Sequence, residues 1–214
     1  MRFSFFITLS FIFLFNLNAQ NAFQKEVDEI VKRNDSIWDS TKETIVFTGS
    51  SSIRFWKDVQ ERFPKQHILN TGFGGSQASD LLYHLESLVL HYNPKKVFIY
   101  EGDNDIFSKK RPKEVVQTTQ AIIQLIKKEK PNTSIILISA KPSIARWRLR
   151  GKYRRLNRRL EKLTLSDINL SYANVWDIML NGRKVKKDIF VEDGLHMNAK
   201  GYELWYQKIK THMK

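Results

Sequence analysis

A serine-rich turn directly after an apolar run is the part of this sequence best suited to chemistry. Residues Thr48–Ile53 read Thr-Gly-Ser-Ser-Ser-Ile and follow the apolar run Ile45–Phe47, a pattern that predicts a buried strand ending in a sharp turn. Such a turn can hold a hydroxyl at the open edge of a sheet, where it can attack a carbonyl carbon. Serine turns after strands are also common helix N-caps, so this turn indicates a reactive site only if partners are found.

Three further turns along the chain offer such partners: Asn70–Ser76, Gly102–Asp105 and Asp193–His196. A serine hydroxyl is a poor nucleophile at neutral pH, so it needs a base and a third group that orients the base. An acid and a histidine three residues apart can supply both. Glycine N–H groups and an asparagine amide can stabilise a tetrahedral oxyanion. Each turn alone is typical of a surface loop, but their ordered combination is far more specific than any one of them.

These four blocks resemble those of the SGNH hydrolase superfamily, the GDSL esterases and lipases, whose name lists a serine, a glycine, an asparagine and a histidine. The resemblance runs from about residue 43 to the C-terminus and is nearest to a bacterial acylhydrolase subgroup. It implies that Ser51 is the nucleophile, that His196 is the base and that Asp193 orients it. It also implies an oxyanion hole formed by Ser51, Gly75 and Asn104, and the activity of a carboxylic ester hydrolase.

One position departs from the family pattern. The usual block reads Gly-Asp-Ser, whereas this chain has Gly49, Ser50 and Ser51. Ser51 is preferred because the family places its nucleophile two positions after the glycine, which leaves Ser50 and Ser52 for the turn and the following N-cap. The departure affects the hydrogen bonding of the turn and the substrate preference more than the capacity for acyl transfer.

Apolar runs alternate with amphipathic segments in the rest of the chain. Strands are expected near 44–49, 67–70, 96–101, 134–140 and 172–176, and helices over 76–92, from 112 and from about 198. Alternating strands and helices predict an α/β fold with a parallel sheet covered on both faces. The resemblance implies a three-layer α/β/α sandwich with a five-stranded flavodoxin-like sheet. Ligands bind at the carboxyl edge of such sheets, where the turns that hold Ser51, Gly75 and Asn104 fall.

The length and composition predict one folded domain behind a leader. A chain of 214 residues that is 42% hydrophobic can bury one good-sized core. Arg2, the apolar run at 5–15 and Ala19 predict a secretory signal peptide over 1–19. A single domain is then expected over 20–214, with an N-terminal helix and linker at 22–42. The apolar run is shorter than the roughly 20 residues of a membrane span, although an uncleaved anchor stays open.

The absence of cysteine and the strong positive charge bear on the surroundings of the protein. Export without disulfides favours a bacterial periplasm or secretion, and a net charge of +14 favours anionic partners. The densest basic stretch, 146–159, is interpreted first as a solvated helix with an apolar inner face, formed by Leu149, Tyr153, Leu156 and Leu160. A surface for anionic polysaccharide or membrane is the alternative. Nucleic acid is disfavoured, because no recognition motif accompanies the charge.

The reaction expected from these features is the cleavage of short acyl esters, acetyl in particular, from a carbohydrate through an acyl-enzyme. Arg54, Phe73 and Arg146 are predicted to contact the substrate. No metal or cofactor is predicted, because the other histidines lack ligand spacing and no phosphate-binding or dinucleotide motif is present. Two alternatives stay open: a lysophospholipase or thioesterase of the same fold, and a non-catalytic module that binds anionic glycans.

Overall fold

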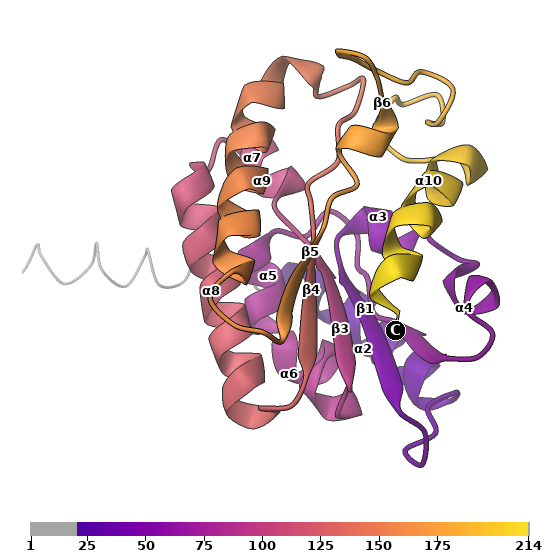
Figure 1. The fold of residues 1–214 in the computed structure, drawn as a ribbon. Helices are drawn as coiled ribbons and strands as arrows, with labels where there is room; N and C mark the ends of the chain where they lie inside the picture. The colour runs from indigo at the N-terminus through magenta and orange to yellow at the C-terminus, as the bar shows by residue number, and fades with distance from the viewer. Residues whose placement is uncertain (1–20, 214) are drawn as a thin grey trace, which may run out of the picture.

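The computed structural model describes residues 21–213, which are built around one parallel sheet (Figure 1). The predicted signal peptide at 1–19 lies outside the described residues. The sheet has the strand order β2-β1-β3-β4-β5, and every neighbouring pair is parallel. Its strands are β1 (Thr44–Gly49), β2 (His67–Asn70), β3 (Lys96–Tyr100), β4 (Ser134–Ile138) and β5 (Leu170–Ala173). This is the flavodoxin-like order, so the predicted fold class is confirmed.

Helices cover both faces of the sheet (Figure 1). One face carries α2 (Gln24–Asp35), α5 (Ala78–Tyr83), α6 (Leu85–Leu88), α8 (Pro112–Glu129) and α9 (Arg150–Thr164). The other carries α3 (Ser51–Arg54), α4 (Val59–Arg62) and α10 (Ala199–Ile209). Shorter elements are α7 (Asp103–Phe107), a hairpin of β6 (Leu180–Asn181) and β7 (Lys184–Val185), and the 3-10 helices η1 (Asn21–Phe23), η2 (Leu90–Tyr92), η3 (Trp147–Leu149), η4 (Asp177–Met179) and η5 (Lys210–His212). Among the described helices, none is both long and apolar enough to cross a membrane.

The alternation of side chains along each strand builds the two apolar layers. In β1, Ile45 and Phe47 pack beneath α3, α4 and α10, while Val46 packs beneath the helices of the other face. Phe47 stacks on Phe98 of the paired strand β3, with ring centroids 4.3 Å apart. Because both faces are covered, the strands read as nearly continuous apolar runs.

Two predicted elements differ from those observed. The last strand runs over Leu170–Ala173 rather than 172–176. The predicted helix at 76–92 is divided into α5, α6 and η2, because His84 and Val89 leave the helical conformation. Trp176 and Trp205 are both buried in the apolar core.

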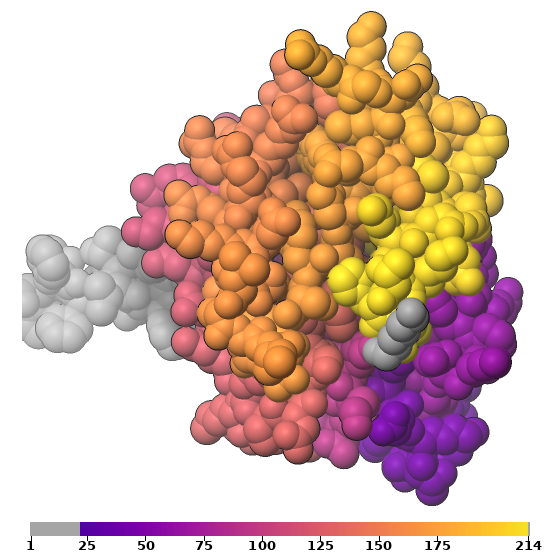
Figure 2. Space-filling model, viewed as in Figure 1, coloured from indigo at the N-terminus to yellow at the C-terminus, as the bar shows by residue number. Residues whose placement is uncertain are grey.

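The basic stretch predicted as a helix over 146–159 forms a solvated helix only from Arg150 onward; Leu149 lies in the 3-10 helix η3 before it, and Arg146 lies in the preceding loop. In α9, Tyr153, Leu156 and Leu160 are buried against the sheet and α8, whereas the arginines face outward. The outer side of α9 makes up much of the orange surface in Figure 2, and α10 makes up much of the yellow surface.

Candidate active site

A sharp turn between β1 and α3 positions Ser51 at the carboxyl edge of the sheet. Gly49 has a φ of +122°, and a Cβ there would lie 2.1 Å from the carbonyl oxygen of Tyr100 on β3. Glycine is therefore required for the two strands to stay paired to their ends. The Ser50 N–H donates to the same carbonyl at 3.0 Å. Ser50 occupies the N-cap position of α3, although its side chain makes no capping hydrogen bond.

Ser51, His196 and Asp193 form one hydrogen-bonded chain. His196 Nε2 lies 3.0 Å from Ser51 Oγ, and His196 Nδ1 lies 2.5 Å from Asp193 Oδ2. Asp193 Oδ1 accepts the backbone N–H groups of Leu195 at 2.8 Å and His196 at 2.9 Å. Although burial acts to raise the pKa of Asp193, these hydrogen bonds outweigh it and lower the pKa to about 2. The charged carboxylate of Asp193 thus stabilises the turn that carries it and orients the imidazole of His196.

The loop that carries this acid and histidine is tied down at three places. The N–H of Val191 donates to the His196 carbonyl at 2.9 Å, which closes the loop on itself. The N–H of Ala145, in the loop after β4, donates to the Gly194 carbonyl at 3.0 Å. Asn198 then caps α10 by accepting the N–H of Gly201. The histidine is therefore held between a neighbouring loop and the last helix.

The structure brings the three expected oxyanion donors to the ends of adjacent strands. Ser51 follows β1, Gly75 follows β2 and Asn104 follows β3. Gly75 has a φ of +72°, and a Cβ added there would meet nothing within 4 Å, so glycine serves the left-handed backbone rather than a close contact. Among the hydrogen bonds of the described residues, none uses the N–H of Ser51 or Gly75. The Asn104 Nδ2 donates to the Ser76 carbonyl at 2.8 Å.

The three residues predicted to contact the substrate, Arg54, Phe73 and Arg146, lie in different environments. Arg54 is exposed, and its Nε lies 3.1 Å from Glu26 Oε1. Phe73 is fully buried and packs edge-on against Phe23, with centroids 5.2 Å apart. The substrate-contact prediction for Phe73 is thereby corrected: its N–H bonds to the Gly49 carbonyl, and its ring belongs to the core.

Arg146 is also buried rather than open at the rim, which corrects its predicted role. Its NH1 donates to Asp103 Oδ1 at 2.7 Å and to Asn104 Oδ1 at 3.0 Å. Asp103 further accepts from the Tyr153 hydroxyl at 2.8 Å and the Lys141 ammonium at 3.2 Å. Sequence reasoning missed this network, since its members come from three segments; the signal present in the sequence was an aspartate directly before Asn104, just after an apolar strand.

A second buried carboxyl supports the loop that carries Gly75. The Ser76 hydroxyl donates to Glu101 Oε1 at 2.7 Å, while Glu101 Oε2 has no hydrogen-bond partner among the described residues. Burial, together with the nearby carboxylate of Asp105, raises the pKa of Glu101 well above its ordinary value. Burial thus favours the protonated form of Glu101 just behind the site.

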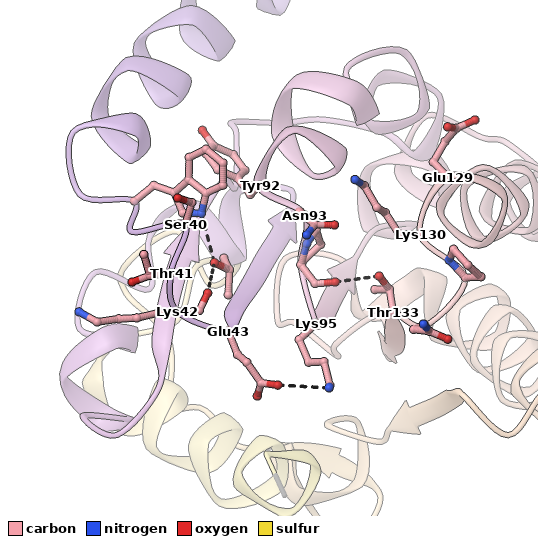
Figure 3. Close-up of a pocket in the computed structure, with 15 residues that line it drawn as sticks. Ser40, Thr41, Lys42, Glu43, Tyr92, Asn93, Lys95, Glu129, Lys130 and Thr133 are labelled. Carbon is pink, nitrogen blue, oxygen red and sulfur yellow. Dashed lines mark hydrogen bonds and ion pairs between the residues drawn. The ribbon is translucent and has the colours of Figure 1, made fainter.

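A separate hollow of about 720 Å³ lies at the opposite edge of the sheet (Figure 3). Its lining includes Thr44, Lys95 and Thr133, next to the starts of β1, β3 and β4. A Glu43–Lys95 ion pair of 3.2 Å crosses it. It contains none of the residues predicted to do chemistry, so the carboxyl edge is the candidate active site.

Comparison with solved structures identifies the same fold in other proteins. A candidate platelet activating factor from Streptococcus pneumonia superposes with a TM-score of 0.78 at 24% identity, covering 94% of this chain and 99% of that chain. A GDSL-like lipase from Bacteroides thetaiotaomicron gives 0.70 at 20% identity, covering 85% and 96%. A mutant acetyl-xylooligosaccharide esterase from Geobacillus Stearmophilus gives 0.66 at 16% identity, covering 79% and 93%. A search of curated protein sequences found no match.

The sequence also matches a family model over most of its length. The GDSL-like Lipase/Acylhydrolase family model aligns with residues 35–204, which include all four blocks of the predicted site. The match confirms the resemblance to the SGNH hydrolases and supports an enzyme that hydrolyses ester bonds. We conclude that the chain belongs to the GDSL-like lipase/acylhydrolase family.

Proposed function

We propose that the protein is a serine esterase in which Ser51 attacks the ester carbonyl. The observation that carries the proposal is the 3.0 Å distance between Ser51 Oγ and His196 Nε2, in a histidine whose other nitrogen is held by Asp193. This is the arrangement that activates a hydroxyl and fixes the tautomer of its base.

In the proposed reaction, a bond forms between Ser51 Oγ and the carbonyl carbon while His196 Nε2 accepts the hydroxyl proton. The negative charge on the carbonyl oxygen is met by the N–H groups of Ser51, Gly75 and Asn104. When the intermediate collapses, the bond to the alcohol oxygen breaks and His196 returns the proton to the leaving alcohol. Water, activated by the same histidine, then releases the acid from the acyl-enzyme.

We propose a short acyl group, acetyl in particular, on a carbohydrate as the substrate. The fold is shared with an acetyl-xylooligosaccharide esterase and with a carbohydrate esterase from Talaromyces cellulolyticus. The leader predicted at 1–19 directs the protein out of the cytoplasm. Such polymers are found in the compartment it then reaches. The excess of lysine and arginine suits an anionic polysaccharide or cell surface.

The proposal is tested by Ser51→Ala, with Ser52→Ala as the matched control. Hydrolysis of p-nitrophenyl acetate is lost in the first variant and kept in the second, because Ser52 is a buried neighbour on the same turn. A fluorophosphonate probe labels the wild type and not the Ser51 variant. Full turnover by Ser51→Ala would overturn the assignment. Absent labelling, together with salt-sensitive polysaccharide binding, would instead identify a non-catalytic glycan module.

A specific surface feature favours a second candidate substrate, an ester or thioester with an apolar chain such as a lysophospholipid. Four exposed apolar side chains, which we call the apolar rim, come from α7 and the loops around the site: Phe55, Phe107, Ile144 and Val191. Each contacts His196 or a residue of the segments that surround the site. Phe55 packs on His196, Phe107 lies under Arg146, Ile144 lies beside Gly194, and Val191 bonds to the His196 backbone. An apolar chain could bury this surface on binding.

A further inference from the structure

The side-chain amide of Asn104 is held at both ends by groups of opposite hydrogen-bonding character. Its Nδ2 donates to the Ser76 carbonyl at 2.8 Å, and its Oδ1 accepts from Arg146 NH1 at 3.0 Å. A carbonyl can only accept and a guanidinium can only donate, so these neighbours fix which end of the amide is nitrogen. Since Nδ2 carries two hydrogens and Ser76 takes one, the other is left for a ligand.

Arg146 is itself anchored on more than one side. The same NH1 donates to Asp103 Oδ1 at 2.7 Å, and the guanidinium lies 4.3 Å from the ring centroid of Phe107. Only 10% of the Arg146 side chain is exposed. Asp103, Asn104 and Phe107 all belong to α7, whereas Arg146 comes from the loop after β4. Arg146 therefore clamps two consecutive residues of α7 from a neighbouring segment.

The carboxylate that anchors Arg146 is fixed in turn. Asp103 accepts from the hydroxyls of Tyr153 at 2.8 Å and Tyr100 at 3.1 Å, and it pairs with Lys141 at 3.2 Å. Burial acts to raise the pKa of Asp103, but the nearby cations Lys141 and Arg146 outweigh it and lower the pKa to about 2. Asp103 thus stays charged and holds the guanidinium in place.

We propose that Arg146 is a positioning residue for the oxyanion donor Asn104. The proposal rests on the esterase function proposed above. Donation from a charged guanidinium to Oδ1 draws electron density from the amide, which makes the opposite N–H a stronger donor. An amide held in advance also needs no reorganisation when negative charge develops on the substrate oxygen. Arg146 contacts no reacting atom in this scheme and acts through Asn104.

The test uses Arg146→Met, Arg146→Lys and a control, Arg150→Met, on p-nitrophenyl acetate. Arg150 is exposed on α9 and has no part in the network. We expect kcat to fall about ten- to hundredfold in Arg146→Met with KM nearly unchanged, since removal of a whole oxyanion donor costs about a hundredfold or more. Arg146→Lys keeps the charge but is shorter than arginine, so it recovers little activity and shows that reach matters.

A double-mutant cycle separates positioning from general damage to the fold. In an Asn104→Ala background, Arg146→Met should cost less than twofold more, because the group it positions is gone. An equal loss in both backgrounds, or an unchanged kcat in the single variant, would overturn the proposal. The side-chain amide resonances of Asn104 supply a readout independent of turnover: they should shift in both Arg146 variants and not in Arg150→Met. If the wild type had no Ser51-dependent turnover, the esterase proposal would fail, while unshifted resonances would refute the positioning.

Discussion

The ring of Phe55 stands edge-on to the imidazole of His196, with centroids 5.0 Å apart and ring planes at 89°. Phe55 is 41% exposed, so part of its ring stays open to solvent beside the proposed base. His196 is therefore held on one side by the Asp193 carboxylate and on another by an aromatic wall. The apolar rim therefore includes a side chain in direct contact with His196 of the proposed triad.

Replacement of Ile144 by serine should reduce activity on long acyl chains more than on acetate. Ile144 is 41% exposed and lies against Gly194 of the triad loop, and covering such a side chain with an acyl chain contributes on the order of 1 kcal/mol. We expect kcat/KM for an octanoate ester to fall about fivefold, with little change for acetate. Ile168→Ser is the control, since Ile168 is 98% exposed and lies between α9 and β5. Equal effects of the two variants would argue against a substrate that covers the rim.

Asp193→Asn should abolish most turnover while leaving the fold intact. The amide cannot hold the imidazole in the tautomer that accepts the serine proton, which in related triads costs about ten-thousandfold in kcat. Asp188→Asn is the control, because Asp188 lies on a nearby loop and its carboxylate makes an exposed ion pair with Lys200. Initial rates on p-nitrophenyl acetate and circular dichroism check the two effects. A variant within tenfold of the wild type would show that the orientation of His196 by this carboxylate is dispensable.

The pH profile of the wild type follows from the lowered pKa of Asp193. Its folded value of about 2 lies below the ordinary 3.8, so the carboxylate is charged above both values, and its interactions are lost only as the pH falls from 3.8 through about 2. Protonation of Asp193 therefore accounts for no activity that is lost above pH 3.8, and the proposed base His196 acts only as the neutral imidazole. The pH dependence of kcat/KM should show a single-proton acid limb. A profile that stays flat down to pH 3 would contradict the proposed base.

Glu101→Gln should make stability less dependent on pH. The folded pKa of Glu101 is raised well above 4.5, so above pH 4.5 the unfolded chain loses a proton that the folded chain keeps. The free energy of unfolding then falls by up to about 1.4 kcal/mol per pH unit until the folded pKa is reached. Because glutamine does not ionise, the variant should gain stability relative to the wild type as the pH rises above 4.5, as measured by urea unfolding.

A sign control accompanies this measurement. Glu114 lies at the surface with 41% of its side chain exposed, and its hydrogen bonds with Arg111 lower its pKa. Glu114→Gln should therefore lose a stabilising interaction that is present above pH 4.5, the reverse of the Glu101 case. Parallel pH slopes for the wild type and Glu101→Gln would contradict the buried, protonated state of Glu101.

The elements predicted best are those whose pattern is local. The strand that ends at Gly49 and the inward face of Tyr153, Leu156 and Leu160 follow from apolar spacing, and the structure confirms both. The long helix predicted at 76–92 was wrong, because spacing alone does not show that His84 and Val89 break it. The burial of Phe73 and Arg146 also could not be predicted, since it depends on segments that arrive from elsewhere in the chain.

The sequence by itself determined the family, the order of the four site blocks and the alternation of strands and helices, because each depends on neighbouring residues and their spacing. Only the tertiary structure decided that the loops after β3 and β4 lie side by side, which brings Asp103 and Asn104 to Arg146 across more than forty residues. It also decided that Glu101 is shut away from water. Charge pairing and desolvation act through space, and distance in space is set by how the sheet is assembled.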